Sequence, residues 1–150
     1  MIKSKILIIL ENFYGYEYGK LTFPTYGVGI VNRKNATYSR ILPYLEEHFT
    51  LRFGETTPFV GIHKKEKFPV DEEWILKAVN SQKWFAIIPA CSKAKAVLDK
   101  HNILYDFSLP HPASWSWRKS LIEDCRDSLL NKTKQWKNHL NFRLQLNLLN

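Results

Sequence analysis

The chain has 150 residues, of which 45% are hydrophobic and 14% aromatic, and its formal net charge is +8. This length and composition predict a single globular domain, residues 1–150, and exclude a disordered chain. The apolar run at residues 6–10 is too short for a signal peptide or a membrane span. Cys91 and Cys125 have no metal-ligand spacing and are expected to be reduced thiols, so we predict a cytoplasmic protein.

The first part of the chain predicts a strand followed by a long loop. Residues 5–10 are a short, continuous apolar run, which is typical of a buried strand. Residues 11–34 contain four glycines and one proline, so we expect an irregular loop. A loop of this length in a compact domain is usually functional.

A helix and a second strand are expected next. Asn35 or Thr37 is suited to cap a helix that runs to about Glu47. Pro43 lies inside this helix and is expected to kink it or to delay its start. Residues 49–53 then predict a second strand.

The middle of the chain predicts a loop, a helix and a third strand. Residues 54–69 form the loop, and Asp71 is expected to cap a helix that runs to about Ser81. Residues 84–88 are again short, continuous and apolar, which indicates a third buried strand.

The last part predicts two helical segments around a fourth strand. Ser92 is expected to cap the first helix, and residues 103–107 form the strand. The chain is expected to be helical from Trp117 onward, with a break near Asn131 and Lys132.

This alternation predicts an α/β protein, a three-layer α/β/α sandwich with a central parallel four-stranded sheet. The strands are apolar without alternation, as expected where both faces of a sheet are buried. Residues 131–150 are expected to form a C-terminal helical extension packed on the domain, because Leu140, Leu144 and Leu148 repeat at helical spacing. We expect a monomer.

The positive charge gathers in short clusters. They lie at residues 64–67, 93–100, 118–119 and 132–137. A basic surface of this kind favours an anionic partner, and nucleic acid is the partner that we expect. The alternative is that these side chains only keep the surface solvated.

Ligands of open α/β sheets bind beyond the carboxyl ends of the strands, and this rule selects three segments of the chain. They are Glu11–Asn12 after the first strand, residues 89–92 after the third and residues 111–115 after the fourth. We expect them to converge on one site.

A histidine between two prolines stands at the third of these places. Pro110 and Pro112 each fix their own φ and bias the preceding residue toward extended backbone, so His111 is held on a stiff loop. Such a loop is suited to aim an imidazole at a bound ligand. The alternative is a tight connection that carries a surface histidine.

At the end of the first strand, the Glu11 carboxylate and the Asn12 amide are suited to position a water molecule and to stabilise developing charge. Ordinary turn chemistry is the alternative for both. Aromatic rings in the following loop are suited to stack on a base or a sugar, or only to pack the loop onto the domain. Because the chain has no phosphate-binding glycine motif and no zinc-ligand spacing, we expect no cofactor and no metal.

Two of these segments resemble the motifs of the uracil-DNA glycosylase superfamily. Residues 10–14, Leu-Glu-Asn-Phe-Tyr, stand where that family has G-[EQI]-[NDA]-P-[GY] after its first strand. Residues 111–114, His-Pro-Ala-Ser, stand where it has H-P-S after its last strand. Leu10, Phe13 and Ala113 depart from the motifs. The resemblance covers about residues 5–130, although only its two ends carry the motifs.

The resemblance implies a DNA glycosylase that hydrolyses the N-glycosidic bond of uracil, or of a related modified or mismatched base, by base flipping. Asn12 would position the attacking water, and Glu11 would match a position that carries a catalytic acid in some branches of the family. His111 would stabilise the departing base. The candidates for stacking on the flipped base are Tyr14, Phe23 and Tyr26.

The resemblance also implies a DNA-binding surface around the last motif. An apolar tryptophan is suited to press into the duplex, and basic residues at a helix start are suited to meet phosphate. The expected DNA-binding residues are Ser92, Ser114, Trp115, Trp117, Arg118 and Lys119.

Three other interpretations stay open at the level of sequence. The chain is an enzyme of the same fold that acts on another modified base or nucleotide, or a nucleic-acid-binding module without catalysis. The third interpretation is a small interaction domain whose terminal helix docks a protein partner. Excision activity and salt-dependent DNA affinity separate these possibilities.

Overall fold

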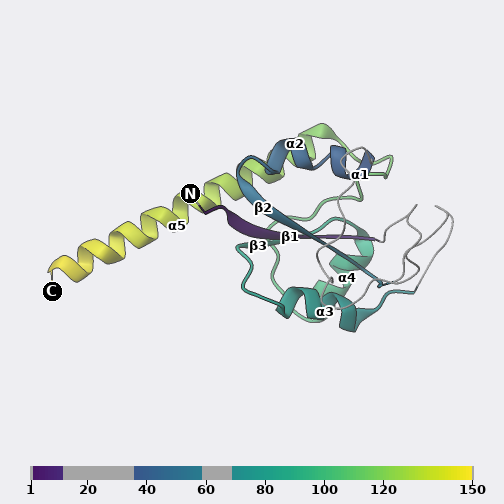
Figure 1. Ribbon diagram of the computed structural model, residues 1–150, viewed down its shortest axis with the longest axis horizontal. Helices are drawn as coiled ribbons and strands as arrows, with labels where there is room; N and C mark the ends of the chain where they lie inside the picture. The colour runs from purple at the N-terminus through teal and green to yellow at the C-terminus, as the bar shows by residue number, and fades with distance from the viewer. Residues whose placement is uncertain (1, 12–35, 59–68, 150) are drawn as a thin grey trace.

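A computed structural model describes residues 2–11, 36–58 and 69–149, and a parallel sheet lies at its centre (Figure 1). The sheet consists of β1 (Ser4–Leu10), β2 (Phe49–Glu55) and β3 (Ala86–Pro89), in the order β2-β1-β3. The α/β class and the parallel arrangement predicted from the sequence are confirmed. Helices cover both faces of the sheet, so the side chains of the central strand β1 have no solvated face, and the strand is apolar from Ile6 to Leu10.

One face of the sheet carries Ile6, Ile8 and Leu10, which are fully or almost fully buried. Three helices cover this face: α1 (Ala36–Ser39), α2 (Leu42–Leu45) and the first part of α5 (Lys119–Leu149). The Tyr38 and Phe53 rings meet edge to face there, with their centroids 5.0 Å apart.

The other face carries Leu7 and Ile9, and two helices cover it: α3 (Glu72–Asn80) and α4 (Ser92–Lys100). Figure 1 shows these two helices on the side of the sheet opposite α1, α2 and α5. Residues that follow one another along β1 therefore belong to different apolar clusters, as the alternation of side chains along a strand requires.

The helix expected from residue 35 or 37 to residue 47 is two short helices. Pro43 lies in the first turn of α2, where a missing N–H costs nothing because the first N–H groups of a helix have no partner within it. Its ring would collide with the carbonyl of Ser39 if the helix were continuous, and α1 ends at Ser39. The proline therefore divides the predicted helix.

The N-terminal cap of α3 was predicted correctly from the sequence, whereas that of α4 was not. Asp71 caps α3 by accepting a hydrogen bond from the Trp74 N–H at 3.0 Å, as expected. The cap of α4 is Cys91 and not Ser92: the Cys91 Sγ accepts from the Ala94 N–H at 3.4 Å, and Ser92 is already helical. The extended backbone of Cys91, with φ −169° and ψ 157°, places its side chain where the serine was expected.

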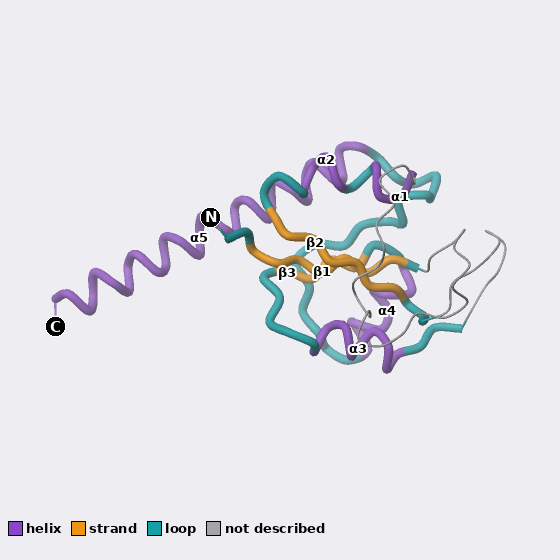
Figure 2. The backbone as a smooth tube through the Cα atoms, viewed as in Figure 1, coloured by secondary structure: helices purple, strands orange, loops and turns teal. Residues whose placement is uncertain are grey.

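The fourth strand expected at residues 103–107 is not formed, although this segment runs beside β3. Asp106 N–H donates to the Ile87 carbonyl at 3.1 Å, and Leu109 N–H donates to the Pro89 carbonyl at 2.9 Å. The Ile87 N–H, however, donates to the Asp106 side chain at 3.1 Å. The Asp106 carboxylate thus takes the place of a backbone carbonyl, so the ladder of backbone hydrogen bonds beside β3 does not continue. Figure 2 accordingly colours the segment as loop.

The helix α5 runs from Lys119 to Leu149 without the break expected near Asn131 and Lys132. No glycine or proline occurs after Pro112, so nothing in the covalent chain stops the helix. Its first part buries Ile122, Cys125 and Leu129 against the sheet.

The second part of α5 leaves the body of the protein. Lys132 pairs with Asp106 at 2.6 Å, whereas residues 134–148 are exposed, and Figure 1 shows the helix projecting beyond the sheet. We expected residues 131–150 to pack on the domain. In the structure, this packing is found only at the beginning of that segment. Within the described ranges, no helix is both long enough and apolar enough to cross a membrane.

Ending the chain at His139 is expected to leave the free energy of unfolding unchanged within about 0.5 kcal/mol, because the side chains of residues 140–148 are exposed. Leu129→Ala, by contrast, is expected to cost about 2–5 kcal/mol, because Leu129 is completely buried. Urea denaturation of the two variants measures both effects. A large loss on truncation would mean that the projecting part of α5 packs on the domain in solution.

Candidate functional site

The carboxyl ends of the three parallel strands meet at one edge of the sheet, and Glu11 lies at its centre. The Thr56 backbone N–H and hydroxyl, just after β2, both donate to the Glu11 carbonyl, at 2.9 and 2.7 Å. On the other side, the Ala90 N–H, just after β3, donates to the Ile9 carbonyl at 2.8 Å. Backbone hydrogen bonds from both neighbours therefore hold the end of β1 in place. We call this region the carboxyl edge.

The Glu11 carboxylate is paired with a lysine from a different element. Lys93, in the first turn of α4, places its Nζ 2.5 Å from the Glu11 Oε1. From the sequence, Lys93 was expected only as one member of a basic cluster, and its pairing with Glu11 was missed. A lysine four residues beyond the end of β3, opposite a carboxylate that follows the neighbouring strand β1, is the signal that would have found it. The ion pair fixes the direction of the carboxylate at the carboxyl edge.

His111 reaches the same edge from the segment that runs beside β3. Its Nδ1 accepts a hydrogen bond from the Ala113 N–H at 3.1 Å, so a neutral imidazole carries its proton on Nε2. Burial lowers the pKa of His111, and the negative charge of Glu11 opposes this effect. In the described part of the chain, the Nε2 has no hydrogen-bond partner. His111 is therefore a neutral donor near neutral pH, within electrostatic reach of Glu11.

The loop that carries His111 is also held by the segment between α1 and α2, which lies on the same face of the sheet as Leu109. The Arg40 guanidinium, between α1 and α2, donates to the Pro112 carbonyl, and Pro112 is buried. The Leu109 N–H bond to Pro89 ties the loop to the end of β3. These contacts agree with the stiffness that the two prolines predict.

Glu55 is a buried carboxyl group that the sequence analysis missed. It is the last residue of β2, lies opposite Leu10 in the register, and is only 1% exposed. Its Oε1 accepts from the Trp74 indole N–H at 3.2 Å, whereas its Oε2 is buried and has no hydrogen-bond partner among the described residues. Burial raises the pKa of Glu55 to about 8, which the Trp74 hydrogen bond only partly offsets.

A protonated, uncharged carboxylic acid therefore stands one strand away from Glu11 at neutral pH. The second strand was predicted to end at residue 53, which placed Glu55 in a loop. Glu55 is the last residue of β2 and Glu11 directly follows β1, so each glutamate stands at the carboxyl end of a strand. That shared position is the signal that the sequence contained.

The loop after His111 presents one tryptophan to solvent and packs the other. Trp115 is 89% exposed, whereas Trp117 packs against the core cluster around α5. The Arg118 guanidinium donates to the carbonyls of both residues, at 2.8 and 2.9 Å, and Ser114 N–H closes a turn onto the His111 carbonyl at 2.8 Å. The exposed ring is thus carried on an ordered backbone.

The other predicted site residues divide into two groups. Ser92 and Lys119 are exposed and are the first residues of α4 and α5. Four further residues lie outside the described ranges: Asn12, Tyr14, Phe23 and Tyr26. The structure thus brings Glu11, His111 and the start of α4 to one edge.

The two cysteines are buried, and the described residues contain no cluster of metal ligands. Cys91 and Cys125 are free and buried, as expected, and burial raises the pKa of their thiols to about 11 and about 12. Across the described ranges, no group of three or more His, Cys, Asp or Glu residues is arranged to hold a metal ion.

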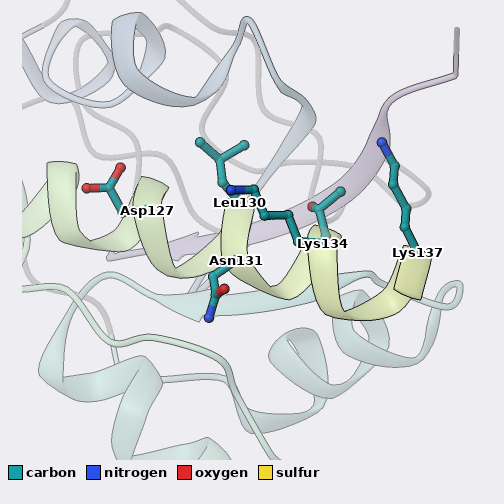
Figure 3. A pocket seen from close by; sticks show the side chains of 6 residues that line it. Asp127, Leu130, Asn131, Lys134 and Lys137 are labelled. Atoms are coloured by element: carbon teal, nitrogen blue, oxygen red, sulfur yellow. The ribbon is translucent and has the colours of Figure 1, made fainter. Parts of the chain in front are cut away.

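Two hollows of the surface lie along α5, away from the carboxyl edge. One of about 450 Å³ is lined by Leu130, Asn131, Lys134 and other residues of α5 (Figure 3). The other, of about 570 Å³, lies where Trp84 and Phe85 precede β3 and face Trp136. Neither contains a predicted site residue.

Comparisons of the chain with models of protein families, with curated proteins and with solved structures find no match. A functional proposal therefore depends on the geometry of the carboxyl edge and on the chemistry of its side chains.

Glu55 is expected to make the stability of the fold depend on pH. Its ordinary pKa is 4.5 and its folded pKa about 8, so the folded state holds a proton that the unfolded state releases between these values. Stability contributed by this group therefore falls as pH rises through this window. At about 1.4 kcal/mol for each pKa unit, the full loss above the window is about 5 kcal/mol.

The measurement is urea denaturation of the native protein and of Glu55→Gln between about pH 5 and pH 9. The variant cannot ionise, so its stability is expected to fall less over this range. Equal slopes in both proteins would contradict a protonated Glu55 in the folded state.

Proposed function

We propose that the carboxyl edge hydrolyses the N-glycosidic bond of uracil, or of a related modified or mismatched base, in DNA. The chain would then be a divergent member of the uracil-DNA glycosylase superfamily. The observation that carries this proposal is the meeting of Glu11 and His111 at one edge, with His111 neutral and its Nε2–H unpaired within the described residues. The parallel sheet with helices on both faces agrees with the expected fold at a coarser level.

In the proposed reaction, His111 donates a hydrogen bond to the leaving base. When the bond between C1′ and the base nitrogen breaks, its electron pair goes to the base, and negative charge develops on the base oxygens. The Nε2–H of a neutral imidazole is a suitable donor to such an oxygen. The Ala113 N–H occupies Nδ1 and so keeps this proton on Nε2.

Glu11 acts on the sugar and on the attacking water. The deoxyribose carbon gains positive charge as the base departs, and a nearby carboxylate stabilises that charge. Water then supplies hydroxide to C1′, and its remaining proton goes to the carboxylate or to solvent. Lys93 holds the carboxylate in one direction, and Asn12 is proposed to position the water.

The proposed DNA contacts surround the His111 loop. Trp115 is 89% exposed, which supports its proposed role as the wedge that fills the space left by a flipped nucleotide. Arg118 and Lys119 at the start of α5, and Ser92 at the start of α4, are proposed to meet phosphate. The formal net charge of +8 favours a polyanionic substrate.

His111→Ala is expected to lower the single-turnover excision rate by about 100-fold or more, because it removes the donor to the departing base. DNA affinity is expected to stay within about twofold, since His111 binds no phosphate in this proposal. The substrates are labelled oligonucleotides that carry uracil, hypoxanthine, xanthine, a G·T mismatch or 5-hydroxymethyluracil, and alkali cleavage reveals abasic sites. Because burial lowers the pKa of His111, the acid limb of the native rate is expected below pH 6.5.

Glu11→Gln provides a second variant of similar size. Its excision rate is also expected to fall, with affinity retained. If affinity and activity fell together in the His111 variant, the histidine would be structural. If no lesion gave a product while salt-dependent DNA binding remained, the chain would be a binding module, or an enzyme for an untested base.

Trp115→Ala is expected to slow excision from duplex DNA by about tenfold, because flipping then lacks its wedge. Excision from single strands is expected to change little. Phe142→Ala is the matched control: Phe142 is also exposed, at 59%, but lies on the projecting part of α5. Equal losses in the two variants, or equal losses on duplex and single strand, would contradict the wedge.

A further inference from the structure

The hollow of about 570 Å³ beside α5 has aromatic residues on both of its walls. Trp84 and Phe85, which directly precede β3, form one wall, and Trp136 of α5 lies on the other. We call it the aromatic hollow. Because Trp84 and Phe85 stand at the amino end of β3, the aromatic hollow lies at the opposite end of that strand from the carboxyl edge.

The wall formed by Trp84 and Phe85 is held in place by the domain. The Trp84 indole N–H donates to the Ala78 carbonyl at 3.1 Å. The Phe85 ring stacks on the Phe49 ring, with their centroids 6.1 Å apart. A ligand would therefore meet a wall that is already ordered, so little conformational entropy is lost there on binding.

The opposite wall presents an exposed ring. Trp136 is 56% exposed, and its ring stacks on that of His139, one turn further along α5. The two ring centroids are 6.1 Å apart, and the angle between the ring planes is 30°. The exposed indole thus belongs to a concave apolar surface that it shares with Trp84 and Phe85, and such a surface is typical of a binding site.

The charges around the aromatic hollow are positive. Lys83, Lys132 and His139 line it, and none of the described residues that line it is acidic. Lys132 is paired with Asp106 at 2.6 Å, which balances its charge, whereas Lys83 is exposed. Residues 128–150 contain three lysines and one arginine but no aspartate or glutamate. These surroundings favour an anionic ligand.

We propose that the aromatic hollow binds single-stranded nucleic acid, with a base stacked on the Trp136 ring and a backbone phosphate beside Lys83. A nucleotide combines a flat ring with a negative charge, and these are the two properties that this surface complements. In a duplex, neighbouring bases already cover the faces of each base, so only a single strand offers a face to the indole. The inference goes beyond the proposed excision, because the aromatic hollow shares no residue with the carboxyl edge.

Two other occupants suit the aromatic hollow less well. A second copy of the chain would bring the same excess of positive charge to the contact, which opposes association. An acidic peptide would satisfy Lys83, but its carboxylates would be repelled by the negative face of the Trp136 ring.

The experiment measures the affinity of a fluorescein-labelled oligothymidylate of about eight nucleotides by fluorescence anisotropy at several salt concentrations. Trp136→Ala is expected to weaken binding by about tenfold or more, because it removes the ring on which the base stacks. Trp136→Phe keeps a ring and is expected to lose less. Lys83→Gln is expected to reduce the slope of log affinity against log salt by about 0.7, as for the loss of one phosphate contact.

Two matched controls change exposed residues of α5 that do not line the aromatic hollow. Phe142→Ala removes another exposed ring, and Lys137→Gln removes a lysine that lines the other hollow (Figure 3). Both are expected to keep the native affinity within about twofold. All the substituted side chains are exposed, so each variant is expected to fold, and circular dichroism checks this.

Several outcomes would overturn the inference. One is native affinity in Trp136→Ala, and another is an equal loss in Trp136→Ala and Phe142→Ala. A loss in Trp136→Ala that is as large for a duplex as for the single strand would also contradict stacking on an open base. If Trp136→Ala instead turned a native dimer into a monomer in sedimentation velocity, with the oligothymidylate affinity unchanged, the hollow would be a contact between two copies.

The comparison with Trp115→Ala separates this site from the carboxyl edge. Trp115→Ala is expected to keep the affinity for oligothymidylate, because Trp115 lies in the loop after His111. A loss in Trp115→Ala but not in Trp136→Ala would place the strand at the carboxyl edge and overturn the inference. Binding that requires Trp136 supports it even if no base is excised, so its failure and that of the proposed function are distinguishable.

Discussion

The pairing of β1 between two parallel strands is the constraint on which the rest of this structure depends. Its apolar side chains are buried on both faces, so helices must cover the sheet on both sides. Because all strands run in one direction, their carboxyl ends share an edge, and each crossover returns to the opposite edge. Glu11, Glu55 and the loop to His111 are neighbours for this reason, although they are far apart in the sequence.

The degree of burial separates the chemical roles of the side chains at this edge. Burial leaves His111 neutral and Glu55 protonated near neutral pH, so both are uncharged donors. Glu11 is more exposed and has a lysine 2.5 Å away. Two carboxyl groups one strand apart thus stand in different environments, one buried and one paired with a cation, and a site that both donates to a leaving group and stabilises positive charge needs such a difference.

The elements that depend on neighbouring residues in the sequence were predicted correctly, whereas those that depend on contacts between distant residues were not. The strand at residues 5–10 and the helix between Asp71 and Ser81 were predicted correctly, because apolar runs and caps are local signals. The fourth strand failed because the Asp106 carboxylate replaces a carbonyl in the ladder. The cap of α4 moved to Cys91 because the backbone leaving β3 is extended at that residue. Neither effect is visible in hydrophobic periodicity.

By itself, the sequence determined that the chain is α/β, that one strand ends just before Glu11 and another near Pro89, and that His111 stands between two prolines, because each depends on neighbouring residues. Only the tertiary structure decided which of these residues meet and in what protonation state. The Lys93–Glu11 pair joins α4 to β1, and the environment of Glu55 is made by Trp74 of α3. A pKa depends on burial and on neighbours in space, and neither is encoded in the spacing of residues along the chain.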